Sequence, residues 1–384
     1  MFRSLRIWRH FDILLLAAVS LMTIAGIAMI RSAIAGNESL AETVPRQSIY
    51  AGLGFVILLV LAMIDYHFWS AITRPMFLVI LGLLALIMIL GQTSFGSTRW
   101  FQVGIIPIQP SELSKIVMIL VLADFFSRNM QHINKPITMI RSLVLVGLPV
   151  LFIYLQPDLS TSIVLIVIWL ALYWAAGISF KQIGILVLLL LIVILIISPF
   201  MLNYFLVGYP KEDNFLIFEY YQMQRIYNFL FPDPEARHGS IYNIEQSMIA
   251  IGSGGLFGQG YGHGTQVQLR FLKVRHTDFI FSALAEEFGF LGASFLILLF
   301  FFIIYRCFRA ARLAKDSFGA LVSYGVAFLL LFQGSFNIGM NLNLFPVSGL
   351  PLPFFSYGGS SLVTSLMGIG LVESVIIRQK DIEF

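Results

Sequence analysis

Long runs of apolar residues recur from one end of the chain to the other, and short polar segments separate them. Each run holds roughly twenty residues, enough for an α-helix to cross the ~30 Å hydrocarbon core of a bilayer. A transmembrane β-barrel would instead show alternating segments of about ten residues. The sequence therefore predicts an all-α, polytopic membrane protein that forms a single integral membrane domain over residues 1–384.

The composition supports this class of protein and narrows its chemistry. Hydrophobic residues make up 58% of the chain and charged residues 11%, whereas soluble domains carry about 25% charged residues. The single cysteine, Cys307, excludes an internal disulfide and a cysteine-based metal cluster. Arg3, Arg6 and Arg9 precede the first apolar run, as in a signal peptide, but this run exceeds the apolar stretch of about 7–15 residues typical of one. We expect an uncleaved first span.

The positions of lysine and arginine set the predicted orientation. We expect about ten spans, at 11–31, 48–66, 75–92, 111–127, 138–155, 160–177, 181–205, 279–305, 317–340 and 357–377. Cytoplasmic loops of membrane proteins carry an excess of lysine and arginine. The cluster from Arg306 to Lys315 is the strongest such signal. With an even number of spans, it predicts that both termini are cytoplasmic and that one large loop, residues 208–277, is extracytoplasmic.

Two segments break the apolar pattern. Residues 208–277 are rich in proline and glycine, so we expect a loop rather than a separate domain. Within it, residues 215–231 interleave aromatic and polar side chains, which is typical of an amphipathic helix lying on the membrane. Residues 344–357 are also broken by proline and glycine, and such backbone at membrane depth is tolerated only when it is buried in protein or lines a wet cavity. We expect 344–357 to be a re-entrant or surface segment.

An acid and a base lie three positions apart at the start of the fourth expected span. Pro110 suits the first turn of a helix, and Glu112 and Lys115 then share one helix face. An ionisable residue inside a span costs at least ~2.5 kcal/mol unless it is paired or solvated, so both are functional candidates. The alternative is a structural pair that fixes helix packing. Arg99 is a candidate third member of the group, beside Glu112.

Two turn-rich segments are further candidates. Asp158 stands directly before the sixth expected span, where an aspartate most often caps the helix; lining a polar cavity is the alternative. Residues 252–264 are rich in glycine but lack the Lys-Ser/Thr ending of a nucleotide-binding loop. Backbone of this kind can approach a pyrophosphate, and an ordinary turn-rich loop fits the same pattern.

Cations gather where the large loop meets the eighth expected span. The segment holds Arg270, Lys273, Arg275 and His276, and Asp278 follows them directly before the apolar run. Acids favour the positive N-terminus of a helix, so a helix-start role is the alternative to a catalytic one. The next acids lie about 12 Å further along this helix, beyond the ~5–9.5 Å that separates a glycosidase carboxylate pair. Asp278 is therefore the candidate reactive carboxylate.

Polar residues also mark the ninth expected span and the segment after it. Gln333, Asn337 and Asn341 are spaced by four residues and share one helix face. We expect Asn337, together with Ser356 of the proline-rich segment, to lie beside the site. Arg225 of the expected amphipathic helix adds a further cation.

These motifs together resemble the SEDS family of bacterial membrane proteins (shape, elongation, division and sporulation). The matching segments run in order over nearly the whole chain: Arg99-Trp100, Gln109–Lys115, Gln156–Leu159, Ile251–Leu256, His276–Phe281 and Pro351–Ser360. Gly264-Thr265-Gln266 is more similar to the rod-shape (RodA-type) branch than to the division branch.

The resemblance implies a peptidoglycan glycosyltransferase of cell elongation in the bacterial cytoplasmic membrane. Such an enzyme polymerises lipid II into glycan strands at the outer face, in complex with a class B penicillin-binding protein that crosslinks them. It implies that Asp278 is essential, and we expect this residue to be the general base for the acceptor hydroxyl. The neighbouring cations are expected to bind the pyrophosphate of lipid II. Membrane lipid is a further expected partner, nucleic acid is not, and no cofactor is certain, although a divalent cation is left open.

Two other functions are weighed against this one. A flippase for lipid-linked cell-wall precursors would use the same polar cavity and cations, but it needs access to both membrane faces. The chain has little polar, broken sequence toward the cytoplasmic side. A non-catalytic scaffold for cell-wall enzymes would not need Asp278.

Overall fold

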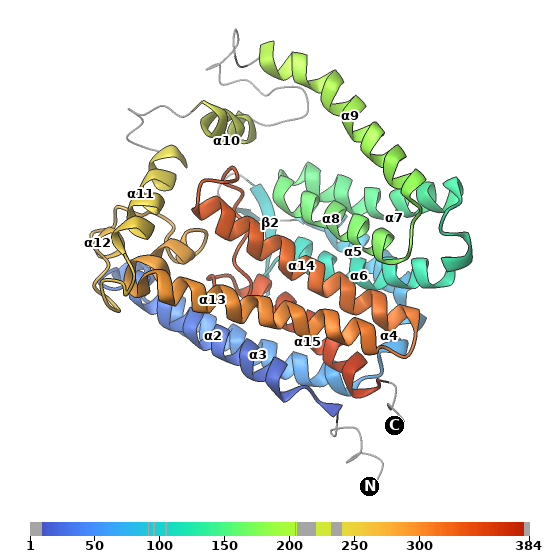
Figure 1. Ribbon diagram of the computed structural model, residues 1–384, viewed down its shortest axis with the longest axis horizontal. Coiled ribbons are helices and arrows are strands. Elements are labelled where there is room, and N and C mark those ends of the chain that lie inside the picture. The colour runs from blue at the N-terminus through green and yellow to red at the C-terminus, as the bar shows by residue number, and fades with distance from the viewer. Residues whose placement is uncertain are drawn as a thin grey trace.

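The protein is a bundle of long helices (Figure 1), and a pocket lies where several of these helices begin. The computed structural model describes residues 10–90, 92–94, 97–103, 106–203, 205, 220–231 and 240–379. Its long helices are α2 (Ile13–Ala33), α3 (Thr43–Met63), α5 (Thr73–Leu90), α6 (Pro110–Arg128), α7 (Pro136–Leu155), α8 (Leu159–Ala175), α9 (Phe180–Asn203), α13 (Ile280–Leu313), α14 (Ser317–Asn341) and α15 (Gly359–Ile377). Arg3, Arg6, Arg9 and the side chain of Arg99 lie outside the described residues.

The long helices confirm the all-α membrane fold and fall at the ten predicted spans. Over the described residues, seven of them are long and apolar enough to cross a bilayer by length and composition, and α5 and α8 contribute shorter apolar helices. The tenth, α6, is less apolar because it carries the Glu112–Lys115 pair and Asp124. The largest difference from prediction is at α13, which continues to Leu313 rather than ending near 305. The added turns end with Arg312, and a cation in the last turn stabilises a helix C-terminus.

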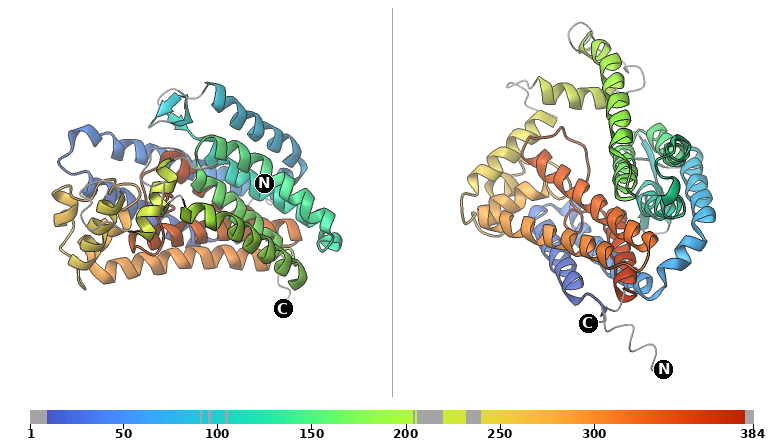
Figure 2. Two further views of the ribbon diagram at one scale, coloured as in Figure 1. Left: turned by 90° about the horizontal axis from the view of Figure 1, so that it is seen from above. Right: turned by 45° about the vertical axis from the view of Figure 1, so that its right-hand side comes forward.

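Burial differs sharply between the helices. In α15, 78% of the spanning stretch is buried, and in α14 67%, so these two helices form the centre of the bundle. Close approach depends on small residues: a Cβ on Gly370 would lie 2.7 Å from the carbonyl oxygen of Leu58, and one on Gly26 would lie 2.6 Å from that of Phe355. By contrast, none of the spanning stretch of α9 is buried. Figure 1 and the right-hand view of Figure 2 show most of α9 standing apart from the other long helices.

A small antiparallel sheet, which the sequence analysis missed, connects α5 to α6. Its strands are β1 (Gln92–Ser94), β2 (Ser97–Val103) and β3 (Ile106–Ile108), in the order β1-β2-β3. Phe101 pairs with Ile108, and β3 leads directly into Pro110, the first residue of α6. This segment contains Thr, Trp, Phe and Val residues bounded by glycines, a pattern that favours β-strands.

The remaining short helices are η2 (Glu38–Leu40), α4 (Tyr66–Ala71), η3 (Met130–His132), α10 (Tyr220–Leu230), α11 (Ser240–Ser253) and α12 (Thr265–Gln268). The predicted amphipathic segment 215–231 is helical over α10, and residues 206–219 and 232–239 of the large loop lie outside the described residues. α11 packs against the first part of α13. Segment 344–358 connects α14 to α15 without forming a helix, and its Leu352, Phe354 and Phe355 are buried.

The glycine-rich loop 254–264 replaces the hydrogen bonds that α13 loses at a break. Gly289 lies inside α13 with φ 66° and ψ −164°, a conformation that only glycine adopts readily. Among the described residues, four backbone bonds span the break, donor first: Gln259 N to Glu286 O (3.0 Å), Gly260 N to Glu287 O (2.9 Å), Phe290 N to Gly255 O (2.8 Å) and Leu291 N to Leu256 O (3.2 Å). The loop thereby fixes the short helical segment 280–288, which begins two residues after Asp278.

Candidate active site

A cavity of about 730 Å³ opens where four helices begin. Residues at or beside the N-termini of α6, α8, α13 and α15 line it, together with residues of α10, α14, β2 and the non-helical segment 346–351. A helix N-terminus carries about half a positive charge and presents free backbone N–H groups. Four such ends around one cavity create a field that favours an anionic ligand.

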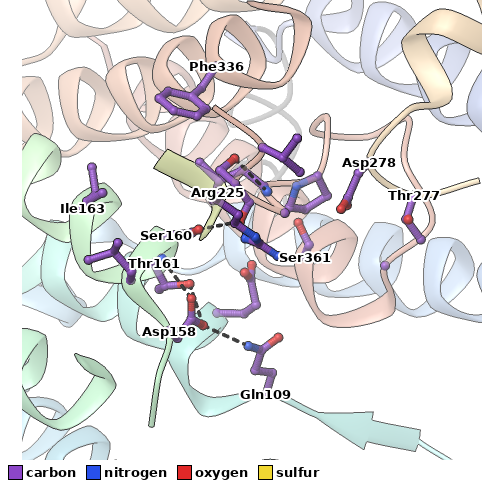
Figure 3. A pocket seen from close by; sticks show the side chains of 18 of the residues that line it. Gln109, Asp158, Ser160, Thr161, Ile163, Arg225, Thr277, Asp278, Phe336 and Ser361 are labelled. Carbon is purple, nitrogen blue, oxygen red and sulfur yellow. Dashed lines mark hydrogen bonds between the residues drawn. The ribbon is translucent and has the colours of Figure 1, made fainter. Parts of the chain in front are cut away.

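Asp278 presents its carboxylate to this cavity (Figure 3). In the described part of the chain, the carboxylate accepts no hydrogen bond and forms no ion pair, although its backbone is held firmly. The carbonyl oxygen of Asp278 accepts hydrogen bonds from the side-chain amides of Asn337 (3.1 Å) and Asn341 (3.0 Å). The hydroxyl of Ser356 donates to the carbonyl of Thr277 at 2.7 Å. The carboxylate is therefore positioned by its backbone and left available for a reaction.

Burial raises the pKa of Asp278, and the positive charge of Arg225 works in the opposite direction. Arg225 projects from α10 and donates from Nη1 to the carbonyl of Ser348 at 3.1 Å. Among the described residues that line the cavity, Arg225 is the only arginine or lysine. The described lining thus combines one cation with the Asp278 carboxylate, whose pKa is raised.

Glu112 and Lys115 form the predicted ion pair at the cavity. Lys115 Nζ lies 2.6 Å from Glu112 Oε1, and the lysine side chain is fully buried while 8% of the glutamate side chain is exposed. Glu112 lines the cavity and Lys115 supports it from behind. Removing either partner would leave an uncompensated buried charge.

Asp158 caps α8 and lines the cavity as well, so both interpretations of this residue hold. Its carboxylate accepts from the backbone N–H of Thr161 at 3.1 Å and from the Thr161 hydroxyl at 2.9 Å. The side-chain amide of Gln109 donates to it at 3.4 Å. This contact joins the start of α6 to the start of α8 across the cavity wall (Figure 3).

The cations of segment 270–276 do not line the cavity. Arg275 is buried and donates to the carbonyls of Ala33 (2.5 Å) and Leu272 (3.3 Å), and burial lowers its pKa. Arg270 donates to the carbonyl of Gly36. Both therefore bind carbonyls at the C-terminal end of α2, where cations are favourable. Lys273 is exposed.

His276 also helps to fix the backbone before Asp278. Its carbonyl accepts a hydrogen bond from the N–H of Tyr357 at 3.0 Å, and the two rings lie 5.9 Å apart. Burial, followed by the charge of Arg275, lowers the pKa of the imidazole. Segment 270–276 thus ties the chain before Asp278 to α2 and to the segment before α15.

The two adjacent glutamates inside α13, Glu286 and Glu287, are expected from the sequence to be packing partners, and in the structure Glu286 binds the start of α12 while Glu287 binds α2. Glu286 accepts hydrogen bonds from the backbone N–H groups of Gln266 (2.7 Å) and Val267 (3.2 Å). Glu287 accepts one from the hydroxyl of Ser32. The sequence signal for such contacts is that two adjacent acids in an apolar helix need partners. Within the described residues, no three His, Cys, Asp or Glu side chains gather as a metal site would require.

Comparison with known proteins places this geometry in context. The sequence profile of the FtsW/RodA/SpoVE family, described as "Cell cycle protein", matches residues 8–381. The peptidoglycan glycosyltransferase MrdB of Escherichia coli (strain K12) is 37% identical over 328 residues, which cover 85% of this chain and 84% of that protein. The probable peptidoglycan glycosyltransferase FtsW of Geobacter sp. (strain M18) is 31% identical, over 96% of this chain and 98% of that one.

Solved structures are similar over almost the whole chain. A chain from a peptidoglycan synthase complex, described as coordinating polymerization and crosslinking, superposes with a TM-score of 0.77 at 27% identity, covering 96% of this chain and 98% of that chain. The rod shape determining protein RodA of Thermus thermophilus superposes with a TM-score of 0.68 at 27% identity, covering 97% and 99%.

Proposed function

The chain belongs to the FtsW/RodA/SpoVE family and is a peptidoglycan glycosyltransferase, and we propose that Asp278 is its general base. The observation that carries the proposal is the Asp278 carboxylate, which faces the cavity without a partner among the described residues and whose pKa burial raises. A base of raised pKa accepts a proton more readily at neutral pH, provided that it is still ionised.

The proposed reaction joins two lipid-linked disaccharide units in the cavity. The Asp278 carboxylate takes the proton of the acceptor 4-hydroxyl of a GlcNAc unit while that oxygen attacks the anomeric carbon of the donor sugar. The bond from this carbon to the pyrophosphate breaks, and undecaprenyl pyrophosphate leaves with both bonding electrons. Arg225 and the surrounding helix N-termini are placed to bind the pyrophosphate as its negative charge grows.

The cations of segment 270–276 receive a different proposed role from the one expected. Because Arg270 and Arg275 donate to carbonyls near the end of α2, we assign them to positioning Asp278 rather than to the pyrophosphate. Lys273, exposed and outside the cavity, is left without an assigned contact. Glu112, Lys115 and Asp158 shape the wall of the cavity beside α6 and α8.

The proposed partner is a class B penicillin-binding protein, which crosslinks the strands that this chain makes. Support comes from the similarity to a chain of a synthase complex that coordinates polymerization and crosslinking. We place this multi-pass protein in the bacterial cytoplasmic membrane with both termini in the cytoplasm, because the Arg306–Lys315 cluster favours that orientation. The cavity then opens toward the outer face, where lipid II is polymerised.

The decisive experiment compares Asp278→Asn with wild type in polymerising purified lipid II in detergent, with glycan length read on a gel. The asparagine keeps the shape and hydrogen bonding of the side chain but cannot accept the proton, and losing a general base costs about 10²–10⁴-fold in rate. We expect no glycan from a folded variant that still binds its partner, whose own site still reacts with penicillin. Glu38→Gln, at an exposed carboxylate away from the cavity, is the matched control.

Near-normal polymerisation by Asp278→Asn would remove this residue from the mechanism and make His276 or Glu286 the next candidate. The same assay separates the alternative functions. A flippase or a scaffold makes no glycan in detergent, where no membrane separates two sides.

A further inference from the structure

A second cavity, of about 480 Å³, lies between α5, α6 and α7. Helix α6 begins at the Asp278 cavity and its last turn lines this second one, so the two cavities lie at opposite ends of the helix. Apolar side chains from all three helices form the wall: Phe77, Leu78, Val121, Phe125 and Leu145. The volume falls in the ~300–1,000 Å³ range of small-molecule sites.

The polar end of this cavity carries two cations and one neutralised acid. Arg74, in the first turn of α5, is exposed and lines the cavity. Arg128, in the last turn of α6, lies 2.9 Å from Asp124, whose carboxylate also accepts hydrogen bonds from the hydroxyls of Ser70 (2.5 Å) and Thr73 (3.3 Å). In the part of the chain that the structure describes, Arg74 forms no hydrogen bond or ion pair. The cavity therefore keeps a net positive end above an apolar wall.

This combination fits an amphiphile with an anionic head. A soluble anion would not need the apolar wall, and a neutral lipid would not need Arg74. The positive end lies on the same side of the bundle as the Arg306–Lys315 cluster, because Tyr66, in α4 just before α5, donates to the carboxylate of Asp316, just after α13, at 2.6 Å. In the orientation proposed above, that side meets the inner leaflet, whose anionic lipids attract basic residues.

We propose that the groove between α5, α6 and α7 binds an anionic phospholipid from the inner leaflet. Its phosphate lies at Arg74 and Arg128, and an acyl chain packs along Phe77, Phe125 and Leu145. Bound there, the lipid contacts all three helices. It stabilises the half of the bundle that carries the β1–β3 sheet and the start of α8.

The test measures the melting temperature of the purified full-length chain in neutral detergent as lipid is added. Phosphatidylglycerol is compared with phosphatidylcholine of the same acyl chains and with glycerol phosphate alone. We expect only phosphatidylglycerol to raise the melting temperature at low concentration. In Arg74→Gln its half-maximal concentration should rise about fivefold, the effect of one basic residue at an anionic surface. Arg312→Gln, which removes an exposed cation on the same side but outside the groove, should respond like wild type.

Several results would overturn the proposal. Equal responses of Arg74→Gln and Arg312→Gln would show a general charge effect, equal stabilisation by phosphatidylcholine would show a site for any lipid tail, and stabilisation by glycerol phosphate would show a soluble-anion site. If Arg74→Gln does not fold, Leu145→Trp fills the groove while leaving both cations, and an unchanged response to phosphatidylglycerol in that variant would also refute the site. These measurements do not depend on glycan synthesis, so their failure leaves the proposed function untouched.

Discussion

Replacing Gly289 by alanine should disrupt the break in α13 that supports the Asp278 segment. The backbone there (φ 66°, ψ −164°) is nearly exclusive to glycine, and forcing another residue into it costs ~1–3 kcal/mol. A Cβ on Gly289 would also lie 2.4 Å from the backbone nitrogen of Gly258 and 2.7 Å from the carbonyl of Leu256. These are backbone atoms, so no side-chain rotation relieves the contact and the loop itself has to move.

Moving the loop breaks hydrogen bonds that span the break. If two of the four backbone bonds are lost, at ~0.5–1.5 kcal/mol each, they add ~1–3 kcal/mol. Together with the strain, Gly289→Ala should destabilise the protein by about 2–6 kcal/mol. It should also slow polymerisation, because segment 280–288 no longer holds Asp278 in place.

Two matched glycines separate strain from steric contact. A Cβ on Gly252, in α11, meets nothing within 4 Å, so Gly252→Ala should be neutral or stabilising by up to ~1 kcal/mol. Gly255 has φ +54° and equally open space, so its alanine variant should lose only the ~1–2 kcal/mol of left-handed strain. Melting temperatures of the purified variants should therefore fall in the order Gly252, Gly255, Gly289. If Gly289→Ala melts as high as Gly252→Ala, the account of the break is wrong.

Three further predictions test the site and the orientation. Glu112→Ala and Lys115→Ala should each lower stability by ~3–5 kcal/mol as a buried pair is broken; wild-type melting and polymerisation in both would make the pair a bystander. Polymerisation should fall as pH drops through the raised pKa of Asp278, and Arg225→Gln should move this acid limb to higher pH while Arg225→Lys leaves it in place; an unmoved limb in the rate profile of Arg225→Gln would show that the charge of Arg225 does not act on Asp278. Cys307 is fully buried, so the topology should be measured on an Arg312→Cys variant that also carries Cys307→Ser. This single thiol should react with an impermeant maleimide only in inverted vesicles. Reaction in intact spheroplasts would show that the orientation is the reverse of the proposed one.

The features that were predicted correctly depend on residues close together in the sequence. The spans follow from runs of apolar residues, the Glu112–Lys115 pair follows from spacing on one helix face, and the Asp158 cap follows from its place before α8. Each depends on residues within a few positions of one another, so no knowledge of the tertiary fold is needed. The β1–β3 sheet also rests on local sequence, but its strands are far shorter than the apolar runs that indicate spans.

What the sequence misjudged depended on partners far along the chain. Arg275 follows other cations and precedes an acid, which indicates a ligand site, yet its partner is a backbone carbonyl at Ala33, some 240 positions away. Arg225, in the expected amphipathic helix, was named as a candidate cation, but it lies 53 positions before Asp278, and only the tertiary fold shows that the two residues share a cavity. The sequence shows that a charged side chain such as Arg275 or Arg225 needs a partner. Only the tertiary fold shows whether that partner is available within the protein or has to be the substrate.

The isolation of α9 has a consequence for how much variation each helix tolerates. None of its spanning stretch is buried against its own chain, so the effect of most substitutions there depends on contact with lipid. Lipid discriminates strongly between apolar and polar side chains but only weakly between leucine and isoleucine. In α15 a single added methyl group at Gly370 meets the backbone of α3. Both helices are long and apolar enough to cross a bilayer, yet substitutions in α9 have to satisfy only the lipid, whereas substitutions in α15 also have to fit the shape of its neighbours. Sequences that drift freely in α9 and hardly at all in α15 would be the evolutionary trace of that difference.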